Sequence, residues 1–245
     1  MSKRTKTESL GFDDLSEDIF GLSVRAFHTV VTVFSKPKEA FAAARLADWN
    51  DRRFTPSIRL VFSVMALLTA VRFLWAGDTS ILYETVKFSV DESMEFASES
   101  ARLAYLDQLL DAFVVAFTPT FMACHIVAAL LLRIWGKGCS FALRLRFYFL
   151  GLLPGTIFSL FSVIGMSHLH FGLWAAYGLI SIIVIFALDF LTVFRGGVTG
   201  NTLLAKAWRS VLFGLTSLVV SIATNIVSVT VAQIYLEFFG SQLAQ

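Results

Sequence analysis

Five long apolar stretches, separated by charged segments, constrain this chain more than any other feature. They cover residues 57–76, 109–135, 147–166, 171–194 and 208–235. Each is long enough to cross a hydrocarbon core, which needs roughly 20 apolar residues. The composition is 56% hydrophobic and the mean hydropathy is +0.72, more than a water-soluble domain of 245 residues would use. We therefore predict an all-α, polytopic transmembrane bundle of five spans.

Basic residues lie on one side of these predicted spans. Six lysines and arginines occur between residues 35 and 59, and others lie in the loops between spans 2 and 3 and between spans 4 and 5. Residues 77–111, from the end of span 1 to the first turn of span 2, have two basic residues against eight acidic ones. Because basic residues beside a span resist translocation, we expect a cytoplasmic N-terminus and an exported, periplasmic C-terminus.

The predicted domain organisation follows from this topology. It comprises a disordered polar stretch at 1–13, cytoplasmic amphipathic or interfacial helices at 14–56, the five-span domain at 57–238 with an exported acidic segment at 78–108, and a short exported tail at 239–245. The first 18 residues have no apolar core, so we expect no cleaved signal peptide. A bacterial inner membrane is favoured over an endomembrane.

The region before the first span has apolar residues at helical spacing. They are Leu15, Ile19, Leu22, Phe27, Val30, Val31 and Phe34. This pattern predicts an amphipathic helix that lies in the headgroup region or fills a groove of the bundle. An ordinary helix packed on the cytoplasmic loops is an equal alternative.

Two proline-initiated helices follow. Pro37 is placed in the first turn of a short helix that continues with Glu39-Ala40-Phe41, and Pro56 begins the first span. This arrangement, ahead of five spans, resembles the Yip/Yif superfamily and its uncharacterised bacterial relatives over about residues 27–238. The resemblance implies a cytosolic N-terminal region and a noncatalytic role, since the eukaryotic members are membrane-traffic proteins that associate with prenylated small GTPases and with one another. The long acidic segment after span 1 departs from the tight loops of that family.

Polar residues at membrane depth give the candidate functional site. His125 on span 2 and Asp189 on span 4 lie at similar predicted depths, with Thr118, Thr120 and Cys124 nearby on span 2. Ionisable groups are costly in hydrocarbon, so the pair is either a proton-linked or substrate-binding site or a buried contact that fixes helix register. If spans 2 and 4 are neighbours, His125 and Asp189 share a proton or a hydrogen bond.

Two further sets of residues are expected to hold the bundle together. Arg72 and Asp111 form a predicted structural clasp near the exported ends of spans 1 and 2. Small residues predict close helix packing, and they are Gly151, Gly155, Gly214, Ser217, Ser221, Thr224 and Ser228. An intramolecular interface is favoured for them, and a homo- or hetero-oligomer interface or a polar conduit is the alternative.

Motifs for catalysis or cofactor binding are not recognised. His168 and His170 lack the further ligands of a closed metal site, and the glycine-rich stretch 195–201 lacks the Gly-Lys-Ser/Thr ending of a phosphate loop. Cys124 and Cys139 are expected to be packing residues rather than a disulfide pair. We therefore expect no enzyme activity, no cofactor or metal and no nucleic-acid partner.

Two functional hypotheses remain from the sequence. The leading one is a membrane-organising scaffold or partner-recruiting adaptor, with membrane lipids around it and a protein partner at the N-terminal helices. The alternative is a small lipid or solute carrier, proton-linked through His125 and Asp189.

Overall fold

The computed structural model describes residues 24–50, 53–74, 98–136, 138–166 and 168–240, together with positions 83, 86–87, 90 and 96. Its elements are α2 (Val24–Ser35), α3 (Pro37–Ala43), α4 (Ser57–Leu74), α6 (Glu99–Leu131), α7 (Phe141–Met166), η1 (Phe171–Leu173), α8 (Trp174–Gly196), α9 (Leu203–Tyr235) and η2 (Leu236–Gly240). No strand occurs in these ranges, which confirms the all-α prediction for the part of the chain described. Residues 1–23 and 241–245 and most of the acidic segment lie outside it.

Four helices in the described part of the chain are long and apolar enough to cross a membrane. They are α6, α7, α8 and α9, the last continuing to Phe238. The chain is therefore a multi-pass membrane protein by the length and composition of its helices. The first predicted span corresponds to α4, which has 18 residues and is about 27 Å long at 1.5 Å per residue. Its apolar part, Ser57–Val71, is shorter than the other four, so the count of five spans stays a prediction.

Capping residues explain why two spans begin earlier than hydropathy alone indicates. The hydroxyl of Ser98 accepts a hydrogen bond from the amide of Ala101, and Thr202 accepts one from Ala205. Such caps satisfy amides that have no partner inside the helix. α6 therefore starts ten residues, and α9 five residues, before the predicted apolar limits at 109 and 208.

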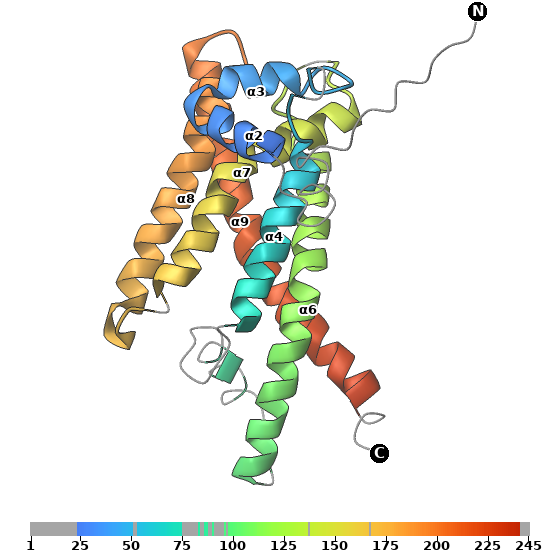
Figure 1. Cartoon of the computed structure of the whole chain (residues 1–245), viewed down its shortest axis with the longest axis vertical. Coiled ribbons are helices and arrows are strands. Elements are labelled where there is room, and N and C mark those ends of the chain that lie inside the picture. Colours follow the sequence, from blue (N-terminus) through green and yellow to red (C-terminus); the bar gives the residue numbers. More distant parts are fainter. Residues whose placement is uncertain are drawn as a thin grey trace, which may run out of the picture.

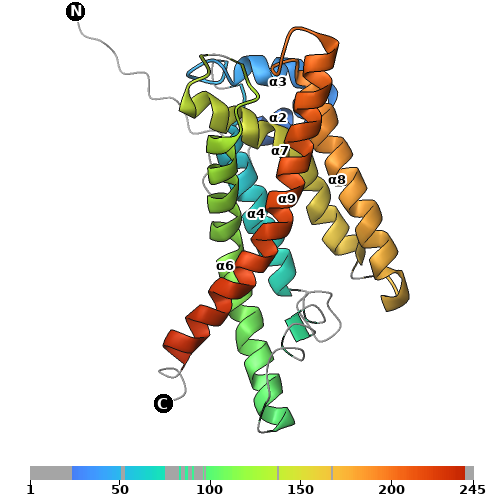
Figure 2. The same cartoon turned by 180° about the vertical axis from the view of Figure 1, so that it is seen from behind.

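The spans form a bundle closed at one end by the two N-terminal helices (Figure 1). We call α2 and α3 the collar, and the end of the bundle that they cover the collar end. α9 packs against both α8 and α6, and α4 packs against α7 and α6. Seen from behind, α9 begins beside α8 at the collar end and then crosses α6 on its way to the far end (Figure 2).

An aromatic layer lies beneath the collar. Phe41 of α3 is fully buried, and its ring centroid lies 5.5 Å from that of Phe147 and 6.4 Å from that of Trp135. Phe213 of α9 continues the layer, 5.6 Å from Trp135. The Phe41 ring lies directly on Gly196, where a Cβ would collide with it. Edge and tilted contacts of this kind favour one arrangement of the rings.

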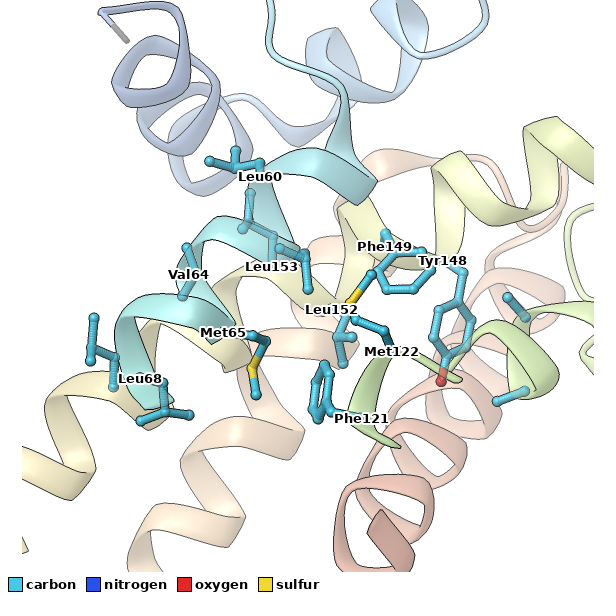
Figure 3. Close-up of a cluster of buried hydrophobic side chains, with 14 of the residues drawn as sticks. Leu60, Val64, Met65, Leu68, Phe121, Met122, Tyr148, Phe149, Leu152 and Leu153 are labelled. Atoms are coloured by element: carbon cyan, nitrogen blue, oxygen red, sulfur yellow. The ribbon is translucent and has the colours of Figure 1, made fainter. Parts of the chain in front are cut away.

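Below this layer, aliphatic and aromatic side chains of α4, α6 and α7 converge (Figure 3). Leu60, Met65 and Leu68 of α4 belong to the same buried cluster as Phe121 of α6 and Leu152 of α7. All five are buried, so α4 is bound to the bundle by apolar packing along its length.

Arginines from two spans hold the collar in place. Arg146 of α7 donates to the carbonyls of Ala44, Leu46 and Ala47 after α3, at 3.2, 2.7 and 3.5 Å. Arg195 of α8 donates to two carbonyls at the end of α2, at 3.3 and 3.0 Å. Guanidinium groups satisfy carbonyls that a helix end leaves free.

α2 turns its small and polar side toward the bundle. Its buried residues are Ala26, Thr29, Thr32 and Val33. Its outward residues are Val24, Phe27, Val31 and Phe34, with 64, 71, 45 and 40% of their surface exposed. A helix therefore occurs over 24–35, within the predicted region, whereas its amphipathic or interfacial role stays a prediction and its predicted start at 14 lies outside the described residues.

Candidate functional site

The small-residue face of α9 lies at the centre of the membrane domain. Gly214, Ser217, Thr224 and Ser228 are buried on it, and Ser221 is half buried. Their spacing of three or four residues puts them on one side of the helix. Because α9 packs on both α6 and α8, this face reaches the polar side chains of both.

Asp189 of α8 is fully buried and is held by two donors. The Ser217 hydroxyl lies 2.7 Å from Oδ2, and the Gly155 amide of α7 donates to Oδ1 at 3.2 Å. A Cβ at Gly155 would collide with the carboxyl group. The carboxyl group therefore joins three helices, α7, α8 and α9, and a glycine is needed beneath it.

Gly151 and Gly214 mark two more close approaches. A Cβ at Gly151 would lie 2.8 Å from both Phe213 Cζ and Val193 Cγ2, and one at Gly214 would lie 2.9 Å from Phe186 Cε2. These carbon–carbon distances are shorter than van der Waals contact. Helices α7, α8 and α9 can therefore pack this closely only because Gly151 and Gly214 have no side chain.

His125 of α6 is fully buried and contacts α7 and α9. Its Nδ1 lies 2.9 Å from the Tyr148 hydroxyl of α7, its Nε2 lies 3.4 Å from the Ser221 hydroxyl of α9, and its ring packs on Phe121 at 4.1 Å. A buried hydroxyl proton needs an acceptor, and the partner of Tyr148 is the imidazole. Tyr148 therefore donates to Nδ1, which places the ring proton on Nε2, facing Ser221.

His125 and Asp189 each bond a serine on neighbouring turns of α9, but they do not bond each other. Within the described chain the partners of His125 are Tyr148 and Ser221, and those of Asp189 are Ser217 and Gly155. Ser217 and Ser221, one turn apart on α9, bond the Asp189 carboxyl group and the His125 imidazole respectively. We call these six residues the buried polar network.

The remaining span 2 candidates lie outside this network. Thr118 shares a hydrogen bond of 2.5 Å with Thr69, and so joins α6 to α4. Thr120 and Cys124 are half buried, and the Cys124 thiol is free. Thr118 therefore fixes helix packing away from the imidazole.

Other predicted residues are placed as follows. Asp111 is exposed on α6, whereas the side chain of Arg72 lies outside the described ones, so their clasp stays a prediction. The Thr224 hydroxyl donates to Val220 O at 2.8 Å, and the buried Ser228 hydroxyl has no hydrogen-bond partner among the described residues.

Polar loops show no assembled metal-ligand cluster in the part of the chain described. No group of three or more His, Cys, Asp or Glu side chains occurs there, and His168 and His170 are exposed.

In the glycine-rich stretch, Gly197 ends α8 with a φ of 68°. Its left-handed backbone accounts for a glycine at this helix end.

A cavity of about 250 Å³ adjoins the buried polar network. Helices α4, α6, α7, α8 and α9 all contribute to its walls, and Gly155 and Ser221 belong to both the cavity and the network. Most of its lining is apolar, with polar groups from α7 and α9.

Neither this cavity nor the role of Tyr148 was predicted from the sequence. A tyrosine at membrane depth was the available signal, since its hydroxyl needs a partner there.

These observations define an α-helical, multi-pass membrane protein with a buried polar network beside a cavity. Comparisons with protein-family models, with curated proteins and with solved structures find no match to this chain. Its function is therefore argued from the residues alone.

Proposed function

We propose that this chain is a noncatalytic membrane scaffold that recruits a protein partner through the outward face of α2. The observation that carries the proposal is the reversed packing of that helix. Four apolar side chains, including Phe27 at 71% exposed, face outward while alanine and threonines face the bundle. A helix that does not use its large apolar side chains for its own fold has them available for a partner.

The setting of α2 supports this role. Arg195 fixes its C-terminal end, and Thr29 accepts a hydrogen bond of 2.9 Å from the amide of Thr55 ahead of α4. A surface fixed in this way loses little conformational entropy on binding. The resemblance to the Yip/Yif superfamily and the distribution of basic residues favour five spans, a cytoplasmic collar and a bacterial inner membrane.

The buried polar network supports a fixed bundle over a transport pathway. Both His125 and Asp189 have hydrogen-bond partners on other helices, and no further Asp, Glu, His, Lys or Arg belongs to the network. Proton-coupled carriers more often have several ionisable groups along a path.

Mass spectrometry of the protein extracted with native lipid in polymer discs tests the proposal. A stoichiometric protein partner is expected with the wild type and should be lost in Phe27→Ser/Val31→Ser. The matched control is Leu203→Ser/Leu204→Ser, whose side chains are also exposed, at 73 and 78%, at the start of α9. A partner that persists in the α2 variant, or no partner in the wild type, contradicts the proposal.

A small lipid or solute carrier is the second candidate, favoured by the cavity beside Ser221. In that case His125→Leu/Asp189→Asn should abolish uptake into proteoliposomes, with the α2 variant transporting normally.

A further inference from the structure

The cavity beside the buried polar network has an asymmetric lining. Its apolar walls include Leu68, Phe117 and Ile182, from α4, α6 and α8. Four of its apolar lining residues, Met65, Leu68, Phe121 and Leu152, belong to the buried cluster drawn in Figure 3. Its polar groups are Thr156, Ser159, Ser221 and Asn225, from α7 and α9. The cavity therefore has an apolar part and a polar part, as a site for an amphiphile requires. We call the four polar residues the polar strip.

Most of the polar strip offers acceptors. The hydroxyl of Thr156 donates to Leu152 O at 2.9 Å, and that of Ser159 donates to Gly155 O at 2.8 Å. Their protons are engaged, while neither oxygen accepts a hydrogen bond from another described residue. The Asn225 amide nitrogen donates to Ser221 O at 2.8 Å, which leaves its carbonyl oxygen as a further acceptor.

Asn225 gives independent support for a ligand. It is exposed on α9 and lies ten residues, about 15 Å, before the end of that helix at Tyr235. An amide oxygen without a donor in hydrocarbon is costly, so a partner from outside the chain is favourable.

Ser221 supplies the complementary donor. Because the ring proton of His125 is on Nε2, the Ser221 oxygen accepts it at 3.4 Å. The hydroxyl proton of Ser221 is then available to the cavity. The strip thus presents several acceptors and one donor, a pattern that a hydroxyl group matches because it both donates and accepts.

The absence of charged residues from the described lining of the cavity argues against a ligand with an ionic head group. No lysine, arginine, histidine, aspartate or glutamate is among the described lining residues. An ionised group brought into such a site would have no compensating charge. A volume of about 250 Å³ equals that of about eight liquid waters, enough for a head and the first part of an alkyl chain.

We propose that this cavity binds an uncharged lipid with a hydroxyl head. The lipid hydroxyl donates to the acceptors of Asn225, Thr156 or Ser159 and accepts from Ser221. Its chain lies among Leu68, Phe117 and Ile182 and leaves by the exposed side of α8. This inference goes beyond the scaffold function, which needs no occupant at this position.

Photolabelling of the purified full chain in lipid nanodiscs tests the proposal. The probe is a long-chain alcohol with a diazirine in its chain, compared with its methyl ether and with the corresponding alkyl phosphate. The alcohol should label wall residues of the cavity and be displaced by unlabelled alcohol. The ether lacks the donor and the phosphate is charged, so each should label about tenfold less, which corresponds to about 1.4 kcal/mol.

The variants narrow the test to the polar strip. Ser221→Ala/Asn225→Leu should lower labelling by the alcohol about tenfold. Thr230→Val removes a comparable exposed side chain of α9, bonded to Ile226 O, and should leave labelling unchanged. Equal labelling by alcohol and ether, or unchanged labelling of the double variant, overturns the proposal. If the double variant does not fold, the alcohol and ether comparison on the wild type decides the question. The α2 variant should bind the alcohol normally, which separates this result from the scaffold proposal.

Discussion

Gly155 is the position at which one methyl group tests the packing of the buried polar network. Its amide donates to Asp189, and a Cβ built there would collide with the carboxyl group. Asp189 is fully buried and is also held by Ser217, so it has little room to move. We therefore expect Gly155→Ala to destabilise the folded bundle.

The magnitude follows from three contributions. Overpacking costs about 1–3 kcal/mol, and loss of one buried hydrogen bond costs about 1 kcal/mol. Alanine is better than glycine in a helix by about 1 kcal/mol, which offsets part of this. The net loss is about 1–3 kcal/mol, or a fall of about 2–12 °C in the midpoint of thermal unfolding for a chain of this size.

The assay is thermal unfolding of the detergent-solubilised protein, followed by tryptophan fluorescence. Gly178→Ala is the matched control, because a Cβ there meets Met166 Cε at an ordinary 3.7 Å. Adding Asp189→Ala to Gly155→Ala should restore part of the loss, since the colliding group is then absent. A Gly155→Ala protein as stable as the Gly178→Ala protein would refute the reasoning.

Three other predictions follow from contacts outside Gly155. Tyr148→Phe removes the donor to the buried imidazole and should lower stability by about 1–3 kcal/mol in the same assay, whereas Tyr177→Phe, at a half-buried position, should have a smaller effect. Arg146→Ala removes three hydrogen bonds to carbonyls after α3, so limited proteolysis should cleave the collar faster while the spans stay intact. Burial raises the pKa of the Cys139 thiol, so less thiolate is present at pH 7. In a Cys124→Ser background, maleimide labelling should therefore be slower than for an exposed cysteine and should continue to rise above about pH 9. Equal rates at pH 7 would contradict this prediction.

The positions of the spans were accessible from sequence because hydropathy and capping are local properties. Apolar runs locate α6, α7, α8 and α9, and the proline at 37 lies in the first turn of α3 as predicted. The helix ends depend on single side chains such as Ser98, which hydropathy does not register.

The contacts between helices were harder to predict from the sequence. Periodicity shows that two faces of α2 differ, but in a membrane protein an apolar face is stable against lipid or a partner as well as against the core. Phe27 was therefore as easily assigned inward as outward. Similarly, depth alone placed His125 near Asp189, whereas the crossing of α9 inserts Ser217 and Ser221 between them.

The hold of Arg195 on the end of α2 also has a consequence for the order of events during synthesis. The arginine and the carbonyl that it binds at Ser35 are 160 residues apart in the chain. At translation rates of about 5–20 residues per second, α2 waits about 8–32 s before its anchor has been made. During that time the side of α2 that later packs on the bundle is open to the insertion machinery, to chaperones and to membrane lipid. The collar can therefore take its final position on the bundle only after α8 has been synthesised and inserted.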